Sequence, residues 1–355
     1  MRLPLVLLVA VTAHAGEPPS RAHSGAHMVS PAPSSPEGMI PSLSTATTWL
    51  NSPPIGPEQL RGKVVLIDFW TYTCINWRRT APYLRAWVDR YGKSGLLLIA
   101  VHSPEFAFEH DLDNVRQAIQ QIGVAYPVAV DNDFAIWRAF GNEYWPALYV
   151  FDSRGRIRHQ VFGEEGYVEA ERVIRKLLEE AGQRDPQTGP TVVDGQGAEK
   201  AADWKSLRSP ENYVGFRRTE NFASPGGIAR GEARKYAVPG KLGLNGWALS
   251  GLWTLSDDRA SVGTPGGKIV YRFHARDLNL VMAPANRGKE VRFRVLLDGK
   301  PPGASHGVDV DQDGVGTLRE QRMYQLIRQP GPIGDRTFEI EFSEPDAAAF
   351  SFTFG

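Results

Sequence analysis

Residues 65–77 read VLIDFWTYTCINW, an apolar run that leads through a short turn to the only cysteine of the chain. The segment from Lys63 to Trp70 is almost continuously apolar, which is typical of a central strand covered on both faces. Cys74 stands where the following segment takes on helical spacing. The stretch therefore predicts a strand–turn–helix unit with a thiol at the start of the helix.

The position of Cys74 predicts a reactive thiol. A helix N-terminus carries unpaired backbone N–H groups and a partial positive charge. Arg78 and Arg79 follow in sequence and add formal positive charge. Both effects favour the thiolate, which is the nucleophilic form of cysteine. The alternative is a buried, inert cysteine in a fold without activity, because a free cysteine often behaves as a small hydrophobic residue.

Strand and helix signals alternate from Thr45 to Gly182. The expected strands are Lys63–Trp70, Gly95–His102, Tyr126–Val130, Ala147–Asp152 and Ile157–Phe162, and the expected helices are Arg78–Tyr91, Asn114–Ile122 and Val168–Ala181. The last two strands read as a hairpin. This order predicts an α/β domain with one mixed central sheet and helices on both of its faces.

This region resembles the thioredoxin superfamily, in particular its exported TlpA/ResA-like redoxins and the extracytoplasmic part of DipZ-type proteins. Asp68-Phe69-Trp70 matches the strand that leads to the family's active site, and Pro82 matches its helix-kink proline. Trp145-Pro146-Ala147 matches its cis-proline loop, and residues 101–106 (VHSPEF) are similar to the DipZ-type branch. The resemblance covers roughly residues 45–182 and implies a thioredoxin-like fold with thiol–disulfide oxidoreductase activity.

The match departs at the second cysteine of the family's C-x-x-C motif, which here reads Cys74-Ile75-Asn76-Trp77. Without a resolving thiol, a mixed disulfide on Cys74 needs an outside thiol for its release. The resemblance thus implies monothiol exchange on protein or small-molecule thiols and disulfides. Thiol peroxidase activity fits less well, because Ile67 replaces the proline that usually precedes the Thr71-x-x-Cys74 pattern. The alternative is a redox-inactive scaffold that acts as an envelope or glycan-binding module.

The resemblance also implies roles for residues around the thiol. Asp68 matches the family's buried carboxylate, which relays a proton, and desolvation should raise its pKa. Trp145 and Pro146 match the loop that presents backbone to an extended substrate. Trp70 and Trp77, together with Trp145, are candidates for an apolar substrate-binding lip around the thiol. Plain core packing is the alternative for these aromatic side chains.

The sequence changes character after a polar, Gly/Pro-rich linker at residues 183–200. Short alternating runs between turn residues predict an all-β sandwich or jelly-roll domain over residues 201–355. The resemblance to DipZ-type proteins implies a carbohydrate-binding-like module. Its candidate sugar-stacking residues are Trp247, Trp253 and Tyr271, and an aromatic core is the alternative.

An acidic segment of the C-terminal region fits a calcium-loop pattern. Asp309, Asp311 and Asp313 alternate before Gly314, and Glu320 follows after five further residues. Alternating carboxylates and a final glutamate suit calcium. The preceding residues read as strand and turn, so a paired helix–loop–helix site is not expected. A calcium-stabilised loop and a solvated acidic turn are both open interpretations, and no other cofactor is expected.

The N-terminus predicts export. Arg2 precedes an apolar run, Leu3–Val11, and a small-residue ending at Ala15, which is the pattern of a secretory signal peptide. The run is shorter than the ~20 apolar residues that cross a bilayer. We therefore expect a periplasmic or secreted protein without a membrane span. Its single cysteine excludes an intramolecular disulfide, so both domains must hold by packing.

The charge of the chain is balanced, with 40 Lys and Arg against 40 Asp and Glu. This balance gives no general attraction to nucleic acid or to an anionic membrane surface. The expected partners are protein thiols or disulfides, or a small thiol, with a glycan or envelope surface as partner of the C-terminal domain. The expected order is a signal peptide (1–15), a flexible linker (16–40), a thioredoxin-like domain (41–182), a second linker (183–200) and a β-sandwich (201–355).

Overall fold

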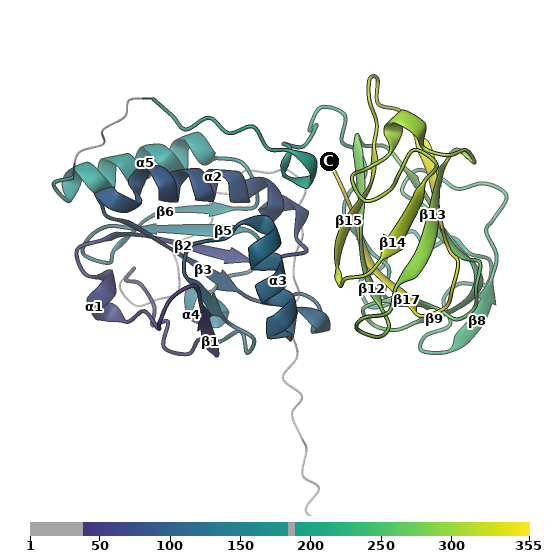
Figure 1. Ribbon diagram of the computed structural model, residues 1–355, viewed down its shortest axis with the longest axis horizontal. Coiled ribbons are helices and arrows are strands. Elements are labelled where there is room, and N and C mark those ends of the chain that lie inside the picture. Colours follow the sequence, from purple (N-terminus) through teal and green to yellow (C-terminus); the bar gives the residue numbers. More distant parts are fainter. Residues whose placement is uncertain (1–37, 184–188) are drawn as a thin grey trace, which may run out of the picture.

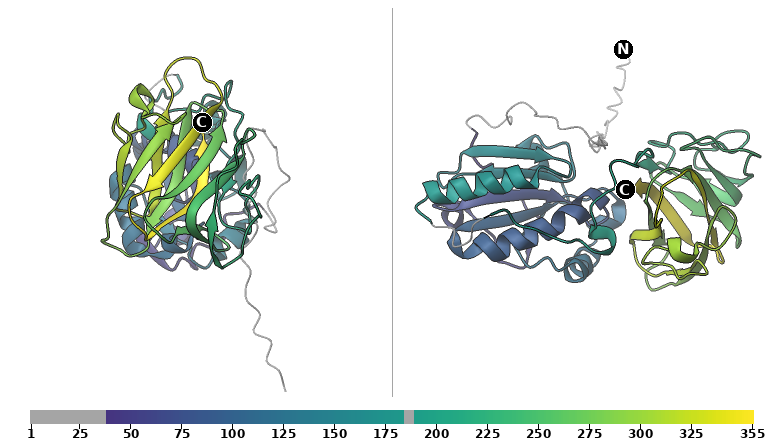
Figure 2. Two further views of the ribbon diagram at one scale, coloured as in Figure 1. Left: turned by 90° about the vertical axis from the view of Figure 1, so that its right-hand side faces the viewer. Right: turned by 90° about the horizontal axis from the view of Figure 1, so that it is seen from above.

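The computed structural model describes residues 38–183 and 189–355, which form two domains that lie side by side (Figures 1 and 2). The predicted signal peptide at residues 1–15, most of the first linker and residues 184–188 lie outside the described residues. Within the described ranges, no helix combines the length and the apolar character that crossing a bilayer requires.

The first domain is an α/β unit around a six-stranded mixed sheet. Its strands are β1 (Thr48–Leu50), β2 (Val64–Trp70), β3 (Leu96–His102), β4 (Val128–Val130), β5 (Ala147–Phe151) and β6 (Ile157–Phe162). Its helices are α1 (Pro57–Leu60), α2 (Ile75–Tyr91), α3 (Leu112–Ile122), α4 (Ala135–Phe140) and α5 (Tyr167–Glu180), with short 3-10 turns η1 (Gly92–Ser94) and η2 (Ala107–His110). The strand order is β1-β4-β3-β2-β5-β6, with β2 parallel to β3 and antiparallel to β5.

Strand β2 is buried along its whole length because helices cover both faces of the sheet (Figure 1). Successive side chains of a strand point to opposite faces. Leu66 packs in a cluster with residues of α2, α3 and α5, whereas Ile67 packs in a second cluster with residues of α4. The apolar run of β2 is continuous because its two faces pack in two separate apolar clusters. The predicted thioredoxin-like architecture is confirmed, and Pro82 lies inside α2.

The second domain is all-β and antiparallel. Its strands are β7 (Asn212–Tyr213), β8 (Ala233–Tyr236), β9 (Trp247–Leu255), β10 (Ala260–Val262), β11 (Gly267–Phe273), β12 (Asp277–Pro284), β13 (Val291–Leu297), β14 (Val315–Leu318), β15 (Arg322–Arg328), β16 (Arg336–Phe342) and β17 (Ala347–Phe354). They form one curled network in the order β14-β13-β16-β11-β9-β10-β17-β12-β15, with β7 on β17 and β8 on β9. The 3-10 turn η4 (Gly303–Ser305) lies between β13 and β14. The predicted sandwich is confirmed.

The aromatic residues expected to stack on sugar form the core of this sandwich instead. Trp247, Trp253 and Tyr271 are each 0% exposed and belong to one large apolar cluster. The indole N–H of Trp253 donates to the backbone carbonyl of Ser250 at 2.8 Å. These side chains lie on the inward face of their strands, so the prediction of a sugar platform from them is wrong.

Apolar side chains from both domains meet at the junction between them. Ile75 opens α2 and Phe106 lies in the loop after β3, and both are buried. They pack with side chains of the second domain: Tyr213, Val281, Ala283, Met323, Ala348 and Phe350. The sandwich therefore stands directly against the first turn of α2.

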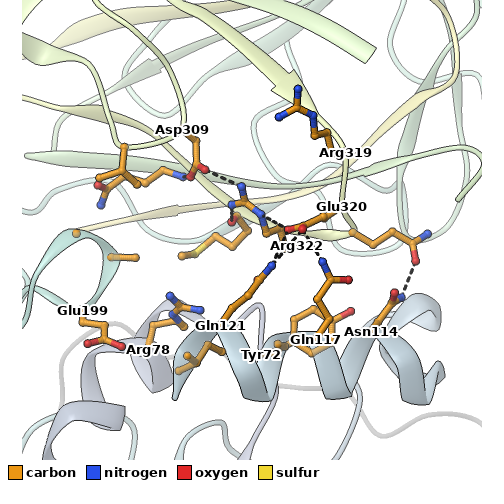
Figure 3. A pocket seen from close by; sticks show the side chains of 18 of the residues that line it. Tyr72, Arg78, Asn114, Gln117, Gln121, Glu199, Asp309, Arg319, Glu320 and Arg322 are labelled. Atoms are coloured by element: carbon orange, nitrogen blue, oxygen red, sulfur yellow. Dashed lines mark hydrogen bonds and ion pairs between the residues drawn. The ribbon is translucent and has the colours of Figure 1, made fainter. Parts of the chain in front are cut away.

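Polar side chains extend this junction along α3. Gln117 and Gln121 donate to the carboxylate of Glu320 in the second domain (Figure 3). Arg287 of the second domain pairs with Asp111, just before α3, at 3.1 Å. The two domains are thus joined by an apolar centre with polar contacts beside it.

The end of the predicted second linker is bound to both domains. It forms a 3-10 turn, η3 (Gly197–Glu199). The carboxylate of Glu199 pairs with Arg85 of α2 at 2.7 Å. The backbone carbonyl of Gly197 accepts from Arg328 of β15 at 2.9 Å. This turn connects α2 to the edge of the sandwich.

Candidate active site around Cys74

Cys74 is the N-cap residue of α2, as the strand–turn–helix pattern predicts. Its backbone is extended, and its carbonyl accepts the first helical hydrogen bond from the N–H of Arg78 at 3.0 Å. Its own N–H donates to the carbonyl of Thr71 at 3.3 Å, which closes the turn after β2. The residue is half-buried.

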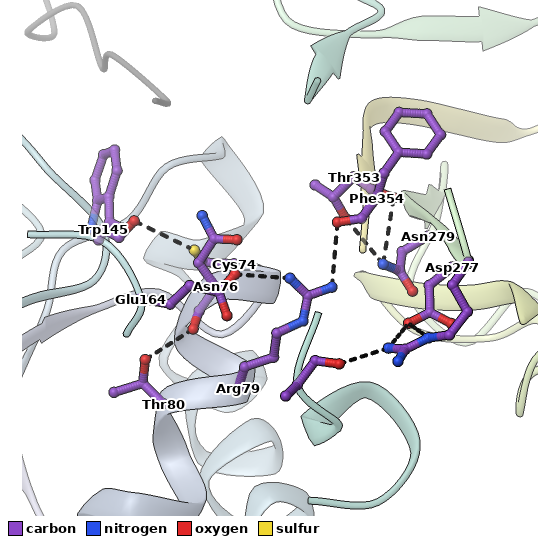
Figure 4. A network of polar contacts seen from close by, with 12 residues as sticks. Cys74, Asn76, Arg79, Thr80, Trp145, Glu164, Asp277, Asn279, Thr353 and Phe354 are labelled. Atoms are coloured by element: carbon purple, nitrogen blue, oxygen red, sulfur yellow. Dashed lines mark hydrogen bonds and ion pairs between the residues drawn. The ribbon is translucent and has the colours of Figure 1, made fainter. Parts of the chain in front are cut away.

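The cis-proline loop lies opposite the thiol. The Trp145–Pro146 peptide bond is cis, which confirms the expectation from the resemblance. The Sγ atom of Cys74 lies 3.8 Å from the backbone carbonyl oxygen of Trp145 (Figure 4). The indole N–H of Trp145 donates to the carbonyl of Ser103 at 3.1 Å, which holds the half-buried ring beside the loop after β3. The thiol and the docking loop are thus brought together.

The ionisation of Cys74 differs from the sequence-based expectation. Burial raises the pKa of the thiol well above its ordinary value, and the negative charges of Glu211 and Glu105 raise it further. Hydrogen bonds from the backbone N–H groups of Trp77 and Asn76 lower the pKa but do not compensate for burial. The prediction of a thiol pKa lowered by the helix start and the nearby arginines is therefore wrong.

The side chains of the two arginines after Cys74 make other contacts or line a cavity. Arg79 is 3% exposed, pairs with Glu164 at 2.9 Å and donates to the carbonyl of Phe354 at 3.3 Å (Figure 4). Arg78 lines a cavity between the two domains (Figure 3). Arg79 thus joins the first domain to the last strand of the second.

Carboxylates from both domains influence the thiol. The phenol of Tyr213 donates to Glu105, and the guanidinium of Arg218 lies 3.1 Å from the same carboxylate and 3.3 Å above the Tyr213 ring. Burial, followed by the charge of Glu105, raises the pKa of Glu211 to about 8. Sequence reasoning missed this group, because Glu105 lies more than 100 residues from Tyr213 and Arg218 and no local motif joins them.

Asp68 lies beneath the site and is bound to the residue that replaces the second cysteine. The indole N–H of Trp77 donates to Oδ2 of Asp68 at 2.8 Å, and both side chains are 0% exposed. Burial raises the pKa of Asp68 to about 7, although the indole hydrogen bond opposes this shift. The predicted rise in the pKa of Asp68 is confirmed.

The predicted apolar lip is not formed by the three tryptophans. Trp70 and Trp77 are 0% exposed, and their ring centroids lie 4.2 Å apart inside the core of the first domain. Only Trp145 among the three retains exposed surface. The substrate-binding prediction for Trp70 and Trp77 is therefore wrong, because the strand and the helix that carry them turn both rings inward.

A second buried carboxylate, Glu109, fixes the turn that carries Cys74. It accepts from the hydroxyl of Thr73 at 2.7 Å and from the backbone N–H groups of Glu105 and Phe106 at 2.6 and 2.9 Å. Burial raises the pKa of Glu109 to about 7. The loop after β3 and the turn before α2 are thereby held to one another, a link that no sequence motif indicated.

The carboxylates of the expected calcium loop are used in other ways. Asp309 and Glu320 pair with Arg322 at 2.7 and 2.9 Å (Figure 3). The carboxylate of Asp311 accepts from the backbone N–H of Asp313 at 3.0 Å within a turn. In residues 38–183 and 189–355, no three His, Cys, Asp or Glu side chains gather in a metal-binding arrangement. The calcium prediction has no support in this geometry.

Comparisons with known proteins cover both domains. The AhpC/TSA family matches residues 49–160, and the family described as "Thioredoxin like C-terminal domain" matches residues 209–355. Protein DipZ of Mycobacterium tuberculosis (strain CDC 1551 / Oshkosh) is 38% identical over 269 residues, which is 74% of this chain. This chain spans only 37% of the length of that relative.

Two further relatives match a shorter part of the chain. The thiol-disulfide oxidoreductase YkuV of Bacillus subtilis (strain 168) is 34% identical over 142 residues, which is 40% of this chain and 95% of YkuV. The solution structure of a thioredoxin-like protein in the oxidized form is 33% identical, with a TM-score of 0.38, and the match covers 41% of this chain and 97% of that one. Because the identity to YkuV extends over nearly its whole length, the chain belongs to the TlpA/ResA/DipZ-like redoxins of the thioredoxin superfamily.

Proposed function

We propose that the protein is an exported thiol–disulfide oxidoreductase that works with one thiol, Cys74. The observation that carries the proposal is the 3.8 Å separation between the Sγ atom of Cys74 and the carbonyl of Trp145, next to the cis bond to Pro146. An extended substrate bound along this loop would present its disulfide to the thiol. The relative YkuV is named a thiol-disulfide oxidoreductase, which supports the general kind of reaction.

The reaction proceeds by two exchanges. The Cys74 thiolate attacks one sulfur of a partner's disulfide, so that a mixed disulfide forms and the other sulfur leaves as a thiolate. Because Cys74 is the only cysteine, a small external thiol then attacks the partner's sulfur in the mixed disulfide. This step frees Cys74 and leaves the partner joined to the small thiol. One disulfide replaces another, and the protein gains no electrons.

Three further residues have roles in this proposal. The thiol must lose its proton before attack, and Asp68 relays that proton, with a pKa of about 7 that suits exchange near neutral pH. Trp145 and Pro146 bind the substrate's backbone at the loop. Trp77 takes no part in exchange, since its buried indole N–H is bonded to Asp68.

A redox-inactive scaffold that binds an envelope partner is the second candidate. The raised pKa of the Cys74 thiol favours it, because the thiolate is scarce at neutral pH. The replacement of the second cysteine by a core tryptophan favours it as well.

The experiment that separates the two candidates is an exchange assay on the full chain. The protein is incubated with a glutathionylated peptide and free glutathione, and release of the peptide thiol is followed. The oxidoreductase is expected to accelerate release and to show a Cys74–glutathione or Cys74–peptide adduct in intact-mass spectra. Cys74→Ser is the matched control and should give the uncatalysed rate. A parent protein that is no faster than Cys74→Ser contradicts the oxidoreductase and supports the scaffold.

Export is proposed from the signal-peptide pattern at residues 1–15. The protein recovered from outside the cytoplasm is expected to begin at Gly16. N-terminal sequencing of that material tests the proposal. A protein that still carries the run Leu3–Val11 would contradict it.

A further inference from the structure

A cavity of about 510 Å³ lies between the two domains. Its floor is formed by α2, α3 and the residue Tyr72, and its roof by β15 and the loops beside it (Figure 3). The turn η3 closes one side. Cys74 does not line this space, so the cavity is separate from the proposed redox site.

Arg78 brings a positive charge to the cavity, and the carboxylates of Glu199 and Asp309 act on it only from a distance. The side chain is half-buried, and in the described part of the chain no carboxylate forms an ion pair with it. Its buried Nε atom has no hydrogen-bond partner there either. Burial lowers the pKa of Arg78, but a guanidinium remains protonated at any physiological pH. A desolvated cation without a partner is unfavourable unless a ligand supplies the missing negative charge.

The opposite wall carries a second polar group without a partner. Gln325 of β15 is 1% exposed, and neither its Oε1 nor its Nε2 atom has a hydrogen-bond partner in the described ranges. It lies on the same strand face as Met323, which packs in the junction between the domains. A side-chain amide offers two donors and one acceptor. Such a group buried without partners points to a polar ligand or to water in the cavity.

Each carboxylate that lines the cavity has an arginine partner, although Asp309 and Glu320 share one. Glu199 pairs with Arg85 at 2.7 Å, and Arg322 pairs with both Asp309 and Glu320 at 2.7 and 2.9 Å. The lining contains four arginines and three carboxylates: Arg78, Arg287, Arg319, Arg322, Glu199, Asp309 and Glu320.

Two of the lining arginines pair with carboxylates that do not line the cavity. Arg287 pairs with Asp111 at 3.1 Å, and Arg319 pairs with Glu290 at 2.9 Å. Of the four lining arginines, Arg78 is therefore the one that has no ion-pair partner among the described residues. An anion can pair with this guanidinium, whereas a cation cannot.

We propose that the cavity binds a small anion with a carboxylate or other oxyanion group, held by the guanidinium of Arg78 and the amide N–H of Gln325. A planar guanidinium matches carboxylate and phosphate oxygens. Because residues of both domains and of η3 line the cavity, a bound anion also ties the domains together. The site is independent of the chemistry proposed for Cys74.

Calorimetric titration of the full chain tests this site with three probes: succinate, inorganic phosphate and succinamide. Succinate or phosphate is expected to bind at one site per chain, and comparison of the two identifies the preferred oxyanion. Succinamide has the size of succinate without its charge and should not bind. Arg78→Gln should weaken anion binding by about tenfold or more. Arg78→Lys, which keeps the charge, should retain part of the affinity, and Gln325→Leu should weaken binding as well.

Arg294→Gln is the matched control, because Arg294 is exposed on β13 and lies outside the cavity. The control should bind the anion as the parent does. Circular dichroism establishes that each variant is folded, and the anion should raise the unfolding temperature of the parent but not of Arg78→Gln. Binding of neither anion by the parent overturns the proposal. Unchanged binding in Arg78→Gln, or equal losses in Arg78→Gln and Arg294→Gln, overturns it too.

Discussion

The indole N–H of Trp77 donates a 2.8 Å hydrogen bond to Oδ2 of Asp68, deep in the first domain. Trp77 occupies the place of the second cysteine of a C-x-x-C motif. Oδ1 of Asp68 has no hydrogen-bond partner in the described ranges. Trp77 thus stands in place of the resolving cysteine and also donates a hydrogen bond to the carboxylate beneath the site. Replacement of a thiol by an indole at this position changes both the redox chemistry and the electrostatics.

Asp68→Asn is expected to flatten the pH dependence of stability. The pKa of Asp68 is about 7 in the folded protein against 3.8 for the free side chain, so the fold favours the protonated carboxyl. The stabilisation that the protonated Asp68 carboxyl contributes to the folded state is therefore fully present below pH 3.8. It is lost as the pH rises to about 7. Over that range the parent should lose about 4 kcal/mol relative to Asp68→Asn. Urea unfolding of both proteins between pH 4 and pH 8 measures this difference.

Other buried groups titrate over the same range but are shared by both proteins. The pKa of Glu109 is raised to about 7 by burial and gives a slope of the same sign, whereas the pKa of His102 is lowered to about 3 and gives the opposite slope. Both contributions cancel in the comparison. A difference between the two proteins that does not change with pH would show that Asp68 is ionised in the folded state.

Trp77→Cys is expected to create dithiol reductase activity. It restores the Cys74-x-x-Cys spacing at the start of α2, so an intramolecular disulfide can close. Loss of a fully buried indole should cost about 3–5 kcal/mol of stability. Turbidity from insulin-disulfide reduction measures the activity, with Trp77→Phe as the control that also lacks the indole N–H. Equal activity in the two variants, or none in a folded Trp77→Cys protein, contradicts the prediction.

Glu211→Gln is expected to lower the pKa of the Cys74 thiol, because it removes one of the negative charges that raise it. The alkylation rate of the native protein with iodoacetamide, followed against pH, reports this pKa. The parent should react slowly at pH 7, and its midpoint should lie above that of a free cysteine. The variant's midpoint should lie lower. Glu232→Gln, an exposed substitution on the sandwich, should match the parent, and a shift of the same size there would implicate the net charge of the protein instead.

Arg79→Ala is expected to destabilise the protein by about 3–5 kcal/mol, because it leaves the buried carboxylate of Glu164 without its cation. It also removes the contact from α2 to the carbonyl of Phe354. Arg172→Ala breaks the exposed pair with Glu169 and should change the free energy of unfolding far less, because solvent screens such a pair. Urea unfolding of both variants gives the comparison. Similar losses in the two would show that the Arg79–Glu164 pair is solvated in solution.

Local patterns predicted the frame of the site. The apolar run of β2, the helical spacing after Cys74 and the Trp145-Pro146 dipeptide each lie within one short segment, and the structure has all three. Helix α4 (Ala135–Phe140) was missed, because six apolar-rich residues are too few to show a helical period. The spacing of carboxylates around Asp309 predicted a calcium site. Arg322, 13 residues later in the sequence, pairs with Asp309 instead.

The state of the thiol depends on contacts that no local pattern reveals. Phe106 packs on Phe350, with ring centroids 5.2 Å apart, although 244 residues separate them in the sequence. This docking brings the second domain against the first turn of α2, and the charge of Glu211 from that domain adds to the rise in the pKa of Cys74 that burial causes. The pKa of the thiol therefore depends in part on the two-domain assembly.

The placement of the sandwich against the first turn of α2 has a consequence for access. Ile75, the residue after the half-buried Cys74, packs against the second domain, and the carbonyl oxygen of Trp145 lies 3.8 Å from the sulfur on the other side. Under the proposed function, a partner of Cys74 must therefore approach the thiol beside the second domain.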